Sequence, residues 1–270
     1  MNIQNKVAVI TGAAGGIGSA LCRALAANGA KVVVSDLNLQ AAQTLADEID
    51  GVAVQCDVSK ESEIQNLVNV SEQNFGQVDI FCSNAGFGRG EPSHAASASD
   101  KAWQLQWDVH VMAHVWAARA LLPNMIERGD GYLLNVASAA GLLNQIGDAA
   151  YSATKHAAVS VAESLAINHN DDGVKVSVIC PQYVNTDILM ITKEQRQQDL
   201  PGVISPQQCA DVIIKGIEDE TFMILPHPQV ADFYQKRAAD PGSWIEGMRR
   251  YRKSLLNDSG KLDMSKFFGF

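Results

Sequence analysis

The chain has 270 residues and a mass of 29.0 kDa, so it is long enough to bury a sizeable core and sits at the upper size of one domain. Apolar residues make up 47% of the chain and charged residues 19%, which excludes a disordered polypeptide. A net charge of −9 lacks the positive field that attracts nucleic acid or anionic lipid, so we expect neither a nucleic-acid partner nor a membrane surface.

The N-terminal residues show no basic stretch followed by a long apolar run, and the first apolar run, 7–10, is too short to cross a bilayer. The 5 cysteines show no C-x-x-C spacing, which fits reduced thiols inside a cell. We therefore expect a cytoplasmic protein. His110 and His114 have i, i+4 spacing without accompanying Cys or Glu ligands, so no metal site is expected.

Short apolar runs alternate with segments of helical period. The runs are mostly rich in Val and Ile and apolar throughout, as strands are when both faces of a parallel sheet are covered; they are 7–10, 31–35, 52–56, 78–83, 132–136, 174–180 and 222–225. The helical segments are 17–28, 39–49, 61–74, 100–127, 149–170 and 206–218. This alternation predicts a single α/β domain over 1–270, a Rossmann-type doubly wound parallel sheet of about seven strands with helices on both faces.

A glycine-rich turn follows the first predicted strand and opens a helix, with the sequence Thr11-Gly12-Ala13-Ala14-Gly15-Gly16-Ile17-Gly18. Gly12 permits a sharp turn. Gly16 and Gly18 remove side chains where a pyrophosphate approaches the backbone and where the helix approaches the strand. The helix N-terminus offers free N–H groups and a positive dipole end to phosphate. A plain structural turn is the alternative interpretation of this motif.

Asp36 follows the second predicted strand, 18 residues after Gly18. A carboxylate there can accept hydrogen bonds from both hydroxyls of an adenine ribose and would repel a 2′-phosphate. No Arg or Lys stands beside it or inside the glycine turn, so the pattern favours NAD over NADP. The alternative is that Asp36 only caps the next helix.

Tyr151 and Lys155 are four positions apart, which places both side chains on one face of a helix. Ser138 lies 13 residues before Tyr151, just after the predicted strand 132–136. Pro181 follows the strand 174–180, and Thr186 comes five residues later. Together with the glycine turn and Asn84-Ala85-Gly86 after the fourth strand, these residues resemble the short-chain dehydrogenase/reductase family of the non-extended type, from residue 6 to about 190.

The resemblance implies an NAD-dependent short-chain alcohol dehydrogenase or carbonyl reductase, which transfers a hydride between nicotinamide and a secondary alcohol or ketone. It implies that Asp57 and Val58 contact adenine, that Asn84 and Gly86 border the ribose, and that Thr186 holds the carboxamide. The other cofactor contacts that it implies are Gly12, Gly16, Ile17, Gly18, Asp36, Tyr151, Lys155, Pro181 and Val184. It also implies a homodimer or homotetramer, with the helices over 100–127 and 149–170 paired across subunits.

The catalytic groups fit this chemistry. A free phenol titrates near pH 10, so an ammonium group and a positive nicotinamide ring nearby are expected to lower the pKa of Tyr151 toward the working pH. Tyr151 is then the acid/base, and Ser138 donates a hydrogen bond to the substrate oxygen. Lys155 lowers the Tyr151 pKa and, by resemblance, also bonds the nicotinamide ribose.

Two residues depart from the family pattern. His110 stands at the register of an Asn that supports a proton-relaying water chain, and we include it as a catalytic residue in that relay. The alternative is that His110 merely packs on a helix whose kink is adjusted differently. Gln182 stands where Gly usually follows Pro181, and it is expected to reshape the substrate pocket.

Residues 183–202 are predicted to form a substrate lid, whose apolar run 188–191 favours a hydrophobic substrate unless the run only packs on the core. Residues 226–270 are predicted to form a C-terminal appendage that caps a pocket or lies on a neighbouring subunit. Two other functions stay open. The spacing of Gly12, Gly15 and Gly18 also matches an epimerase or dehydratase of the extended branch. The chain length and the early position of Asn84 argue against this function. The departures at His110 and Gln182 would suit a non-catalytic NAD-binding sensor or scaffold. The presence of the catalytic residues argues against this function.

Overall fold

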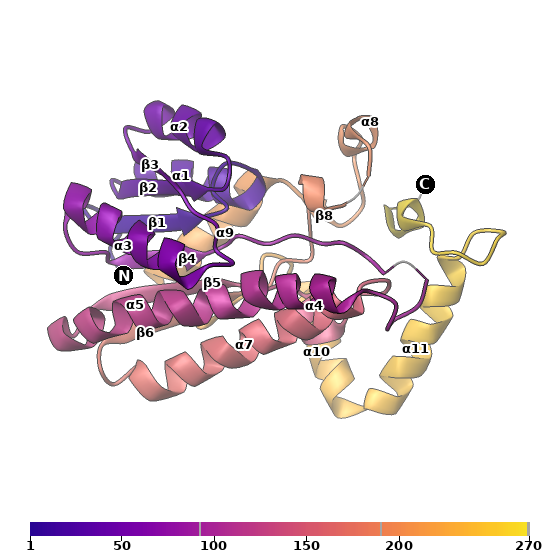
Figure 1. The fold of residues 1–270 in the computed structure, drawn as a ribbon. Coiled ribbons are helices and arrows are strands. Elements are labelled where there is room, and N and C mark those ends of the chain that lie inside the picture. The colour runs from indigo at the N-terminus through magenta and orange to yellow at the C-terminus, as the bar shows by residue number, and fades with distance from the viewer. Residues whose placement is uncertain (92, 190, 269–270) are drawn as a thin grey trace.

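A seven-stranded parallel sheet forms the centre of the computed structural model, which describes residues 1–91, 93–189 and 191–268 (Figure 1). Its strands are β1 (Val7–Thr11), β2 (Lys31–Asp36), β3 (Val52–Gln55), β4 (Ile80–Ser83), β5 (Gly131–Val136), β6 (Val174–Ile179) and β9 (Met223–Ile224). Their order across the sheet is β3-β2-β1-β4-β5-β6-β9, and every neighbouring pair is parallel. The winding reverses between β1 and β4, where sheets of this type bind ligands.

Helices cover both faces of this sheet. One face packs against α1 (Gly16–Ala27), α2 (Leu39–Glu48) and α9 (Pro206–Glu218), and the other against α3 (Glu61–Phe75), α5 (Ala113–Arg128) and α7 (Ala149–His169). Every residue of β1 and β5 is buried, as expected for strands covered on both sides. The predicted fold class is confirmed, and the predicted strand boundaries differ from the observed ones by two residues or fewer.

The predicted helix over 100–127 contains an irregular turn. Here α4 (Asp100–Trp107) continues into the π-helical turn η1 (Asp108–Met112) and then into α5. A π turn inserts one extra residue into the helical repeat, and such turns often occur at functional sites. His110 lies inside η1 and is fully buried. The predicted helical segment is observed, but the sequence did not predict the π turn, because apolar residues continue across it and hide the change of phase.

The segments after β6 form a small layer beside the carboxyl edge of the sheet. β7 (Tyr183–Val184) pairs with β8 (Val203–Ile204), and between them lie η2 (Asp187–Leu189) and α8 (Lys193–Arg196). After β9 come α10 (Gln229–Ala239), α11 (Pro241–Ser254), which extends away from the sheet in Figure 1, and η3 (Met264–Phe268). Phe268 then packs against Leu189 and Leu200, so the C-terminal segment returns onto the region of β7 and β8.

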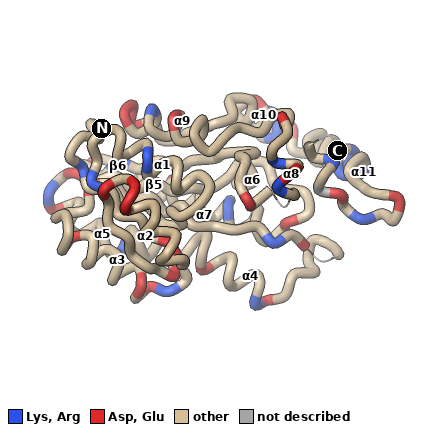
Figure 2. The backbone as a smooth tube through the Cα atoms, turned by 90° about the horizontal axis from the view of Figure 1, so that it is seen from above, with Lys and Arg blue, Asp and Glu red and all other residues tan. Residues whose placement is uncertain are grey.

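Charged residues of both signs are interspersed along the chain, as Figure 2 shows. In the part of the chain that the structure describes, no helix combines the length and the apolar character that a membrane span requires.

A buried pair of polar side chains joins α5 to β5. His114 is 2% exposed, and its Nδ1 lies 2.6 Å from Oδ1 of Asn135. Because an amide oxygen only accepts hydrogen bonds, Nδ1 of His114 carries the proton and donates it. Burial lowers the pKa of His114 to about 4, so the ring is neutral in the folded protein at neutral pH.

His114→Asn is expected to reduce the loss of stability in acid. The pKa of histidine is about 6.5 in the unfolded chain, whereas the pKa of His114 in the folded protein is about 4. The contribution of His114 to the free energy of unfolding is therefore fully present above pH 6.5 and is lost as the pH falls toward 4. Between pH 6.5 and pH 4, the protonation of this histidine in the unfolded chain lowers the free energy of unfolding by about 3 kcal/mol. Thermal unfolding at pH 7.5 and pH 5 should show a smaller fall in Tm for His114→Asn than for the wild type. Equal falls would contradict this assignment.

Candidate active site

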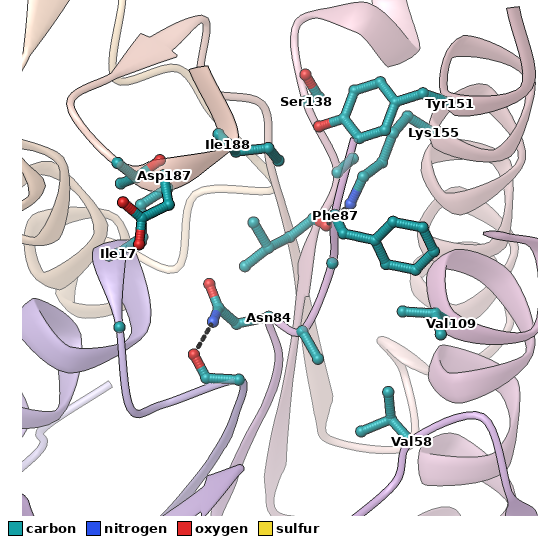
Figure 3. A pocket seen from close by; sticks show the side chains of 18 of the residues that line it. Ile17, Val58, Asn84, Phe87, Val109, Ser138, Tyr151, Lys155, Asp187 and Ile188 are labelled. Carbon is teal, nitrogen blue, oxygen red and sulfur yellow. Dashed lines mark hydrogen bonds between the residues drawn. The ribbon is translucent and has the colours of Figure 1, made fainter. Parts of the chain in front are cut away.

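The carboxyl ends of the parallel strands border a cavity of about 670 Å³ (Figure 3). This volume is typical of a small-molecule or cofactor site. The cavity brings together most of the predicted site residues, namely Gly12, Gly16, Ile17, Asp36, Asp57, Val58, Asn84, Gly86, Ser138, Tyr151, Lys155, Pro181, Val184 and Thr186. Two predicted residues, Gly18 and His110, lie behind the lining in the described structure.

The glycine turn provides a cradle at one end of the cavity. Gly12 has φ +60°, and a Cβ there would lie 2.7 Å from Cα of Ala85. A Cβ on Gly18 would overlap the carbonyl oxygen of Gly12, so Gly18 permits close packing between α1 and the turn. Gly15, the residue before α1, faces open space and provides no side chain that could accept hydrogen bonds from the first N–H groups of the helix. The first turn of α1 also contains no acidic residue. The N–H groups of this helix end therefore suit a pyrophosphate.

Asp36 links the end of β2 to the glycine turn. Its Oδ2 accepts a hydrogen bond from the Ala14 N–H at 3.0 Å, and its Oδ1 accepts one from the Asn38 N–H at 3.0 Å. The N-cap of α2 is Asn38, whose side chain accepts from the Ala41 N–H, so Asp36 is not the cap. Asp36 lines the cavity, and a carboxylate oxygen that accepts one hydrogen bond can accept another, so both oxygens can still bind ribose hydroxyls.

Asn84 holds the first turn against β4. Its Nδ2 donates to the carbonyl oxygens of Thr11 at 2.8 Å and Gly12 at 3.1 Å, and the Thr11 hydroxyl accepts from the Asn84 N–H at 3.0 Å. Figure 3 shows the side chain beside the cavity with one of its hydrogen bonds. The amide group of Asn84 therefore fixes the shape of the cradle, while Gly86 leaves room on the lining beside it.

Ser138, Tyr151 and Lys155 lie together at the other end of the cavity. Ser138 follows β5, and Tyr151 and Lys155 project from the first turns of α7, whose N-cap Asp148 accepts from the Tyr151 N–H at 3.1 Å. The Tyr151 hydroxyl points toward Ser138 in Figure 3. Lys155 is 3% exposed, its Nζ donates to the Val136 carbonyl oxygen at 2.9 Å, and Nζ lies 5.7 Å from the centre of the Tyr151 ring.

Burial dominates the protonation of this pair. It raises the pKa of Tyr151 to about 12, although the hydrogen bond with Ser138 acts in the opposite direction. Burial also lowers the pKa of Lys155 to about 8. The expected lowering of the Tyr151 pKa is therefore not produced by the protein alone, because removal from water outweighs the neighbouring groups. The protein by itself keeps Tyr151 as a neutral acid.

His110 connects the loop after β4 to α7. Its Nε2 accepts from the Phe87 N–H at 3.2 Å, so Nδ1 carries the ring proton and donates to the Thr154 hydroxyl at 3.0 Å. The same hydroxyl donates to the carbonyl oxygens of Ala150 or Tyr151, at 3.0 and 2.9 Å. The His110 ring packs edge-on against Tyr151 at 5.5 Å between centroids. Burial holds the pKa of His110 well below its usual value of 6.5.

Several lining residues were missed in the sequence, among them Arg89, Leu105, Val109 and Asp187. Arg89 lies on a loop outside any motif, and no signal pointed to it, whereas Asp187 begins η2 within the predicted lid 183–202. Leu105 and Val109 lie within the predicted helical segment 100–127, and neither belongs to a motif that carries the family resemblance. The apolar run 188–191 divides: Ile188 lines the cavity, Leu189 and Ile191 pack toward Phe268, and residue 190 lies outside the described residues.

Comparison with known proteins gives consistent matches. The family model for short chain dehydrogenases matches residues 6–197. The 1-deoxy-11-beta-hydroxypentalenate dehydrogenase of Streptomyces exfoliatus is 31% identical over 83% of this chain and 84% of its own length. The cyclohexanol dehydrogenase of Acinetobacter sp. (strain SE19) is 29% identical over 85% and 94%. A short chain dehydrogenase/reductase from Burkholderia phymatum, solved in complex with NAD, has a TM-score of 0.81 at 28% identity and covers 89% of this chain and 95% of its own.

Gly18→Ala is expected to lower stability by about 1–3 kcal/mol, because its new methyl group overlaps the Gly12 carbonyl oxygen. Gly15→Ala is the matched control, since its methyl group enters open space and its backbone, at φ −149°, is extended. Thermal unfolding measures both variants. A Tm for Gly18→Ala that equals that of Gly15→Ala would show that α1 does not approach the turn so closely.

Proposed function

The chain belongs to the short-chain dehydrogenase family, and on that premise we propose that it is an NAD(H)-dependent oxidoreductase for a secondary alcohol or ketone. The observation that carries the proposal is one cavity with the glycine cradle and Asp36 at one end and Ser138, Tyr151 and Lys155 at the other. The NAD-bound Burkholderia phymatum neighbour supports the cofactor, and the relative named cyclohexanol dehydrogenase supports the substrate class.

The residues present fit NAD. The free N–H groups at the start of α1 suit its pyrophosphate, and Asp36 suits the unmodified ribose while opposing the charge of a 2′-phosphate. We assign Asp57 and Val58 to the adenine and Val184 and Thr186 to the nicotinamide end, and all four residues line the cavity. When bound, NAD supplies the hydride chemistry that no side chain provides.

The side chains of this protein handle the proton. Neutral Tyr151 donates its hydroxyl proton to the carbonyl oxygen during ketone reduction and is left as tyrosinate. In the oxidation direction the tyrosinate accepts the hydroxyl proton of the alcohol and becomes neutral again. Ser138 donates a hydrogen bond to the same substrate oxygen and holds it beside Tyr151. Below about pH 8 Lys155 is cationic, which favours the tyrosinate that forms when Tyr151 gives up its proton.

The proposed substrate is hydrophobic. Phe87, Leu105, Val109 and Ile188 contribute apolar surface to the cavity. We place the lid in residues 183–202 and regard 226–270 as an appendage, in line with the packing of Phe268 on Leu189 and Leu200. Assembly as a dimer or tetramer through α5 and α7 is part of the proposal, supported by the exposed side chains of Ile126 and Ile167 on these helices.

Tyr151→Phe is expected to lower turnover by about 10²- to 10⁴-fold, because it removes the transferable proton and little else. The assay follows absorbance at 340 nm with NAD or NADP and a panel of secondary alcohols, and with NADH or NADPH and the corresponding ketones. NADH fluorescence measures cofactor binding, which the variant should retain. Tyr234→Phe, remote from the cavity lining, is the matched control.

The rival functions give different results in the same assay. A sensor or scaffold would bind NADH without turnover on any substrate. An epimerase or dehydratase would convert substrate without a net change in absorbance. Full activity of Tyr151→Phe would contradict the assignment of Tyr151 as the acid/base.

His110→Gln is expected to leave the pH dependence of alcohol oxidation unchanged between pH 7 and 10. We infer that His110 positions Phe87 and Thr154 instead of relaying protons, because both ring nitrogens are engaged and its pKa lies well below 6.5. The neutral ring therefore does not titrate in this range. The test compares the dependence of kcat on pH for the wild type and for His110→Gln. If the variant lost a titration step that the wild type shows, His110 would take part in proton relay.

A further inference from the structure

A second buried histidine, His227, contacts the backbone that borders the nicotinamide end of the cavity. His227 is 2% exposed and lies three residues after Ile224 of β9. Because Ile224 pairs with Ile179 in a parallel register, His227 is placed beside Gln182, three residues after Ile179. The neighbouring residues Pro226 and Pro228 restrict the backbone on both sides of the histidine.

The two ring nitrogens of His227 bind consecutive residues. Nδ1 accepts from the Gln182 N–H at 3.1 Å, and Nε2 lies 3.1 Å from the Tyr183 carbonyl oxygen. An N–H group only donates and a carbonyl only accepts, so Nδ1 is bare and Nε2 carries the proton. This assigns a single neutral tautomer to the ring. A protonated ring would turn Nδ1 into a donor facing another donor, the Gln182 N–H.

A second contact holds the side chain of Gln182. Its Oε1 accepts a hydrogen bond from Nε2 of Gln229 at 3.2 Å, at the start of α10. The segment that begins the C-terminal part of the chain therefore holds the main chain of Gln182 and Tyr183 and the side chain of Gln182. Pro181, Gln182 and Val184 all line the cavity.

The held segment is also connected to the catalytic serine. The Pro181 carbonyl oxygen accepts from the Ala139 N–H at 2.8 Å and lies 3.5 Å from Oγ of Ser138. The backbone around Ser138 is therefore in direct contact with the residues that follow β6. A shift of the Pro181–Gln182 backbone would move Val184 on the lining and change the surroundings of Ser138. Displacements of about 1 Å in such positions are enough to cost large factors in rate.

We propose that His227, with Gln229, is a positioning residue that clamps residues 181–184 in the geometry required for nicotinamide binding and for Ser138. His227 does not touch the reacting atoms. It acts through the backbone of Gln182 and Tyr183, and it does so as a neutral ring with one donor and one acceptor. The inference rests on the proposed function, because it concerns the same cavity.

The test compares His227→Leu, which removes both hydrogen bonds at similar volume, with His227→Asn, whose Oδ1 can still accept from the Gln182 N–H. NADH fluorescence gives Kd for the reduced cofactor, and steady-state assays give kcat and KM for NAD. His227→Leu should raise Kd and KM about tenfold and lower kcat, while His227→Asn should recover most of the loss. His169→Leu, at the far end of α7, is the control and should match the wild type.

The outcomes separate this inference from the proposed function. If the wild type binds no NADH, the proposed function fails. If the wild type binds NADH and folded His227→Leu matches its Kd, KM and kcat, the clamp is overturned. If His227→Leu does not fold, Gln229→Leu decides, since this exposed side chain can be removed without unfolding the chain. It should raise KM for NAD two- to threefold at an unchanged Tm, and an unchanged KM would overturn the clamp.

Discussion

The parallel pairing of the strands is the constraint on which the site depends. Because every strand of the sheet runs in the same direction, the loops that follow them all emerge at one edge. Residues as distant in sequence as Gly12, Ser138 and Thr186 therefore border one cavity. The helices on both faces bury the strands and leave this edge as the place where polar side chains can meet a ligand.

Burial is the second constraint, and it acts on protonation. Tyr151 and Lys155 are both removed from water, and each is pushed toward its neutral form. Because the protein alone disfavours the tyrosinate and weakens the Lys155 ammonium, the protonation of the pair is sensitive to the charge of whatever occupies the cavity. The same low dielectric that raises the Tyr151 pKa strengthens the effect of an added positive charge beside it. Under the proposed function, we expect the proton affinity of Tyr151 to fall when the positively charged oxidised cofactor is bound.

Apolar runs and glycine spacing were sufficient to predict the sheet and the glycine turn, because both are local signals. The resemblance to a family supplied Ser138, Tyr151 and Lys155 as a group, and the structure brings these residues and Asp36 to one cavity. The sequence was insufficient for the π turn around His110, since an apolar helix face does not reveal one inserted residue. It did not predict α10 and α11 either. α11 has no buried residue, and its few apolar side chains stand among many charged ones, so its sequence gives a weak signal of a helix packed on a core. Arg89 lies on a loop, whose path depends on tertiary contacts.

Histidine serves in this protein as a fixed connector between elements. His110, His114 and His227 are each almost fully buried, and burial is the largest cause that lowers the pKa of each ring. A neutral imidazole has one donor and one acceptor on opposite sides of a rigid ring, so it can join two backbone or side-chain groups at a set distance. His110 joins Phe87 to Thr154, and His227 joins Gln182 to Tyr183. The two rings therefore hydrogen-bond the segments that follow β4 and β6 along the cavity, and burial disfavours the protonated form of each ring.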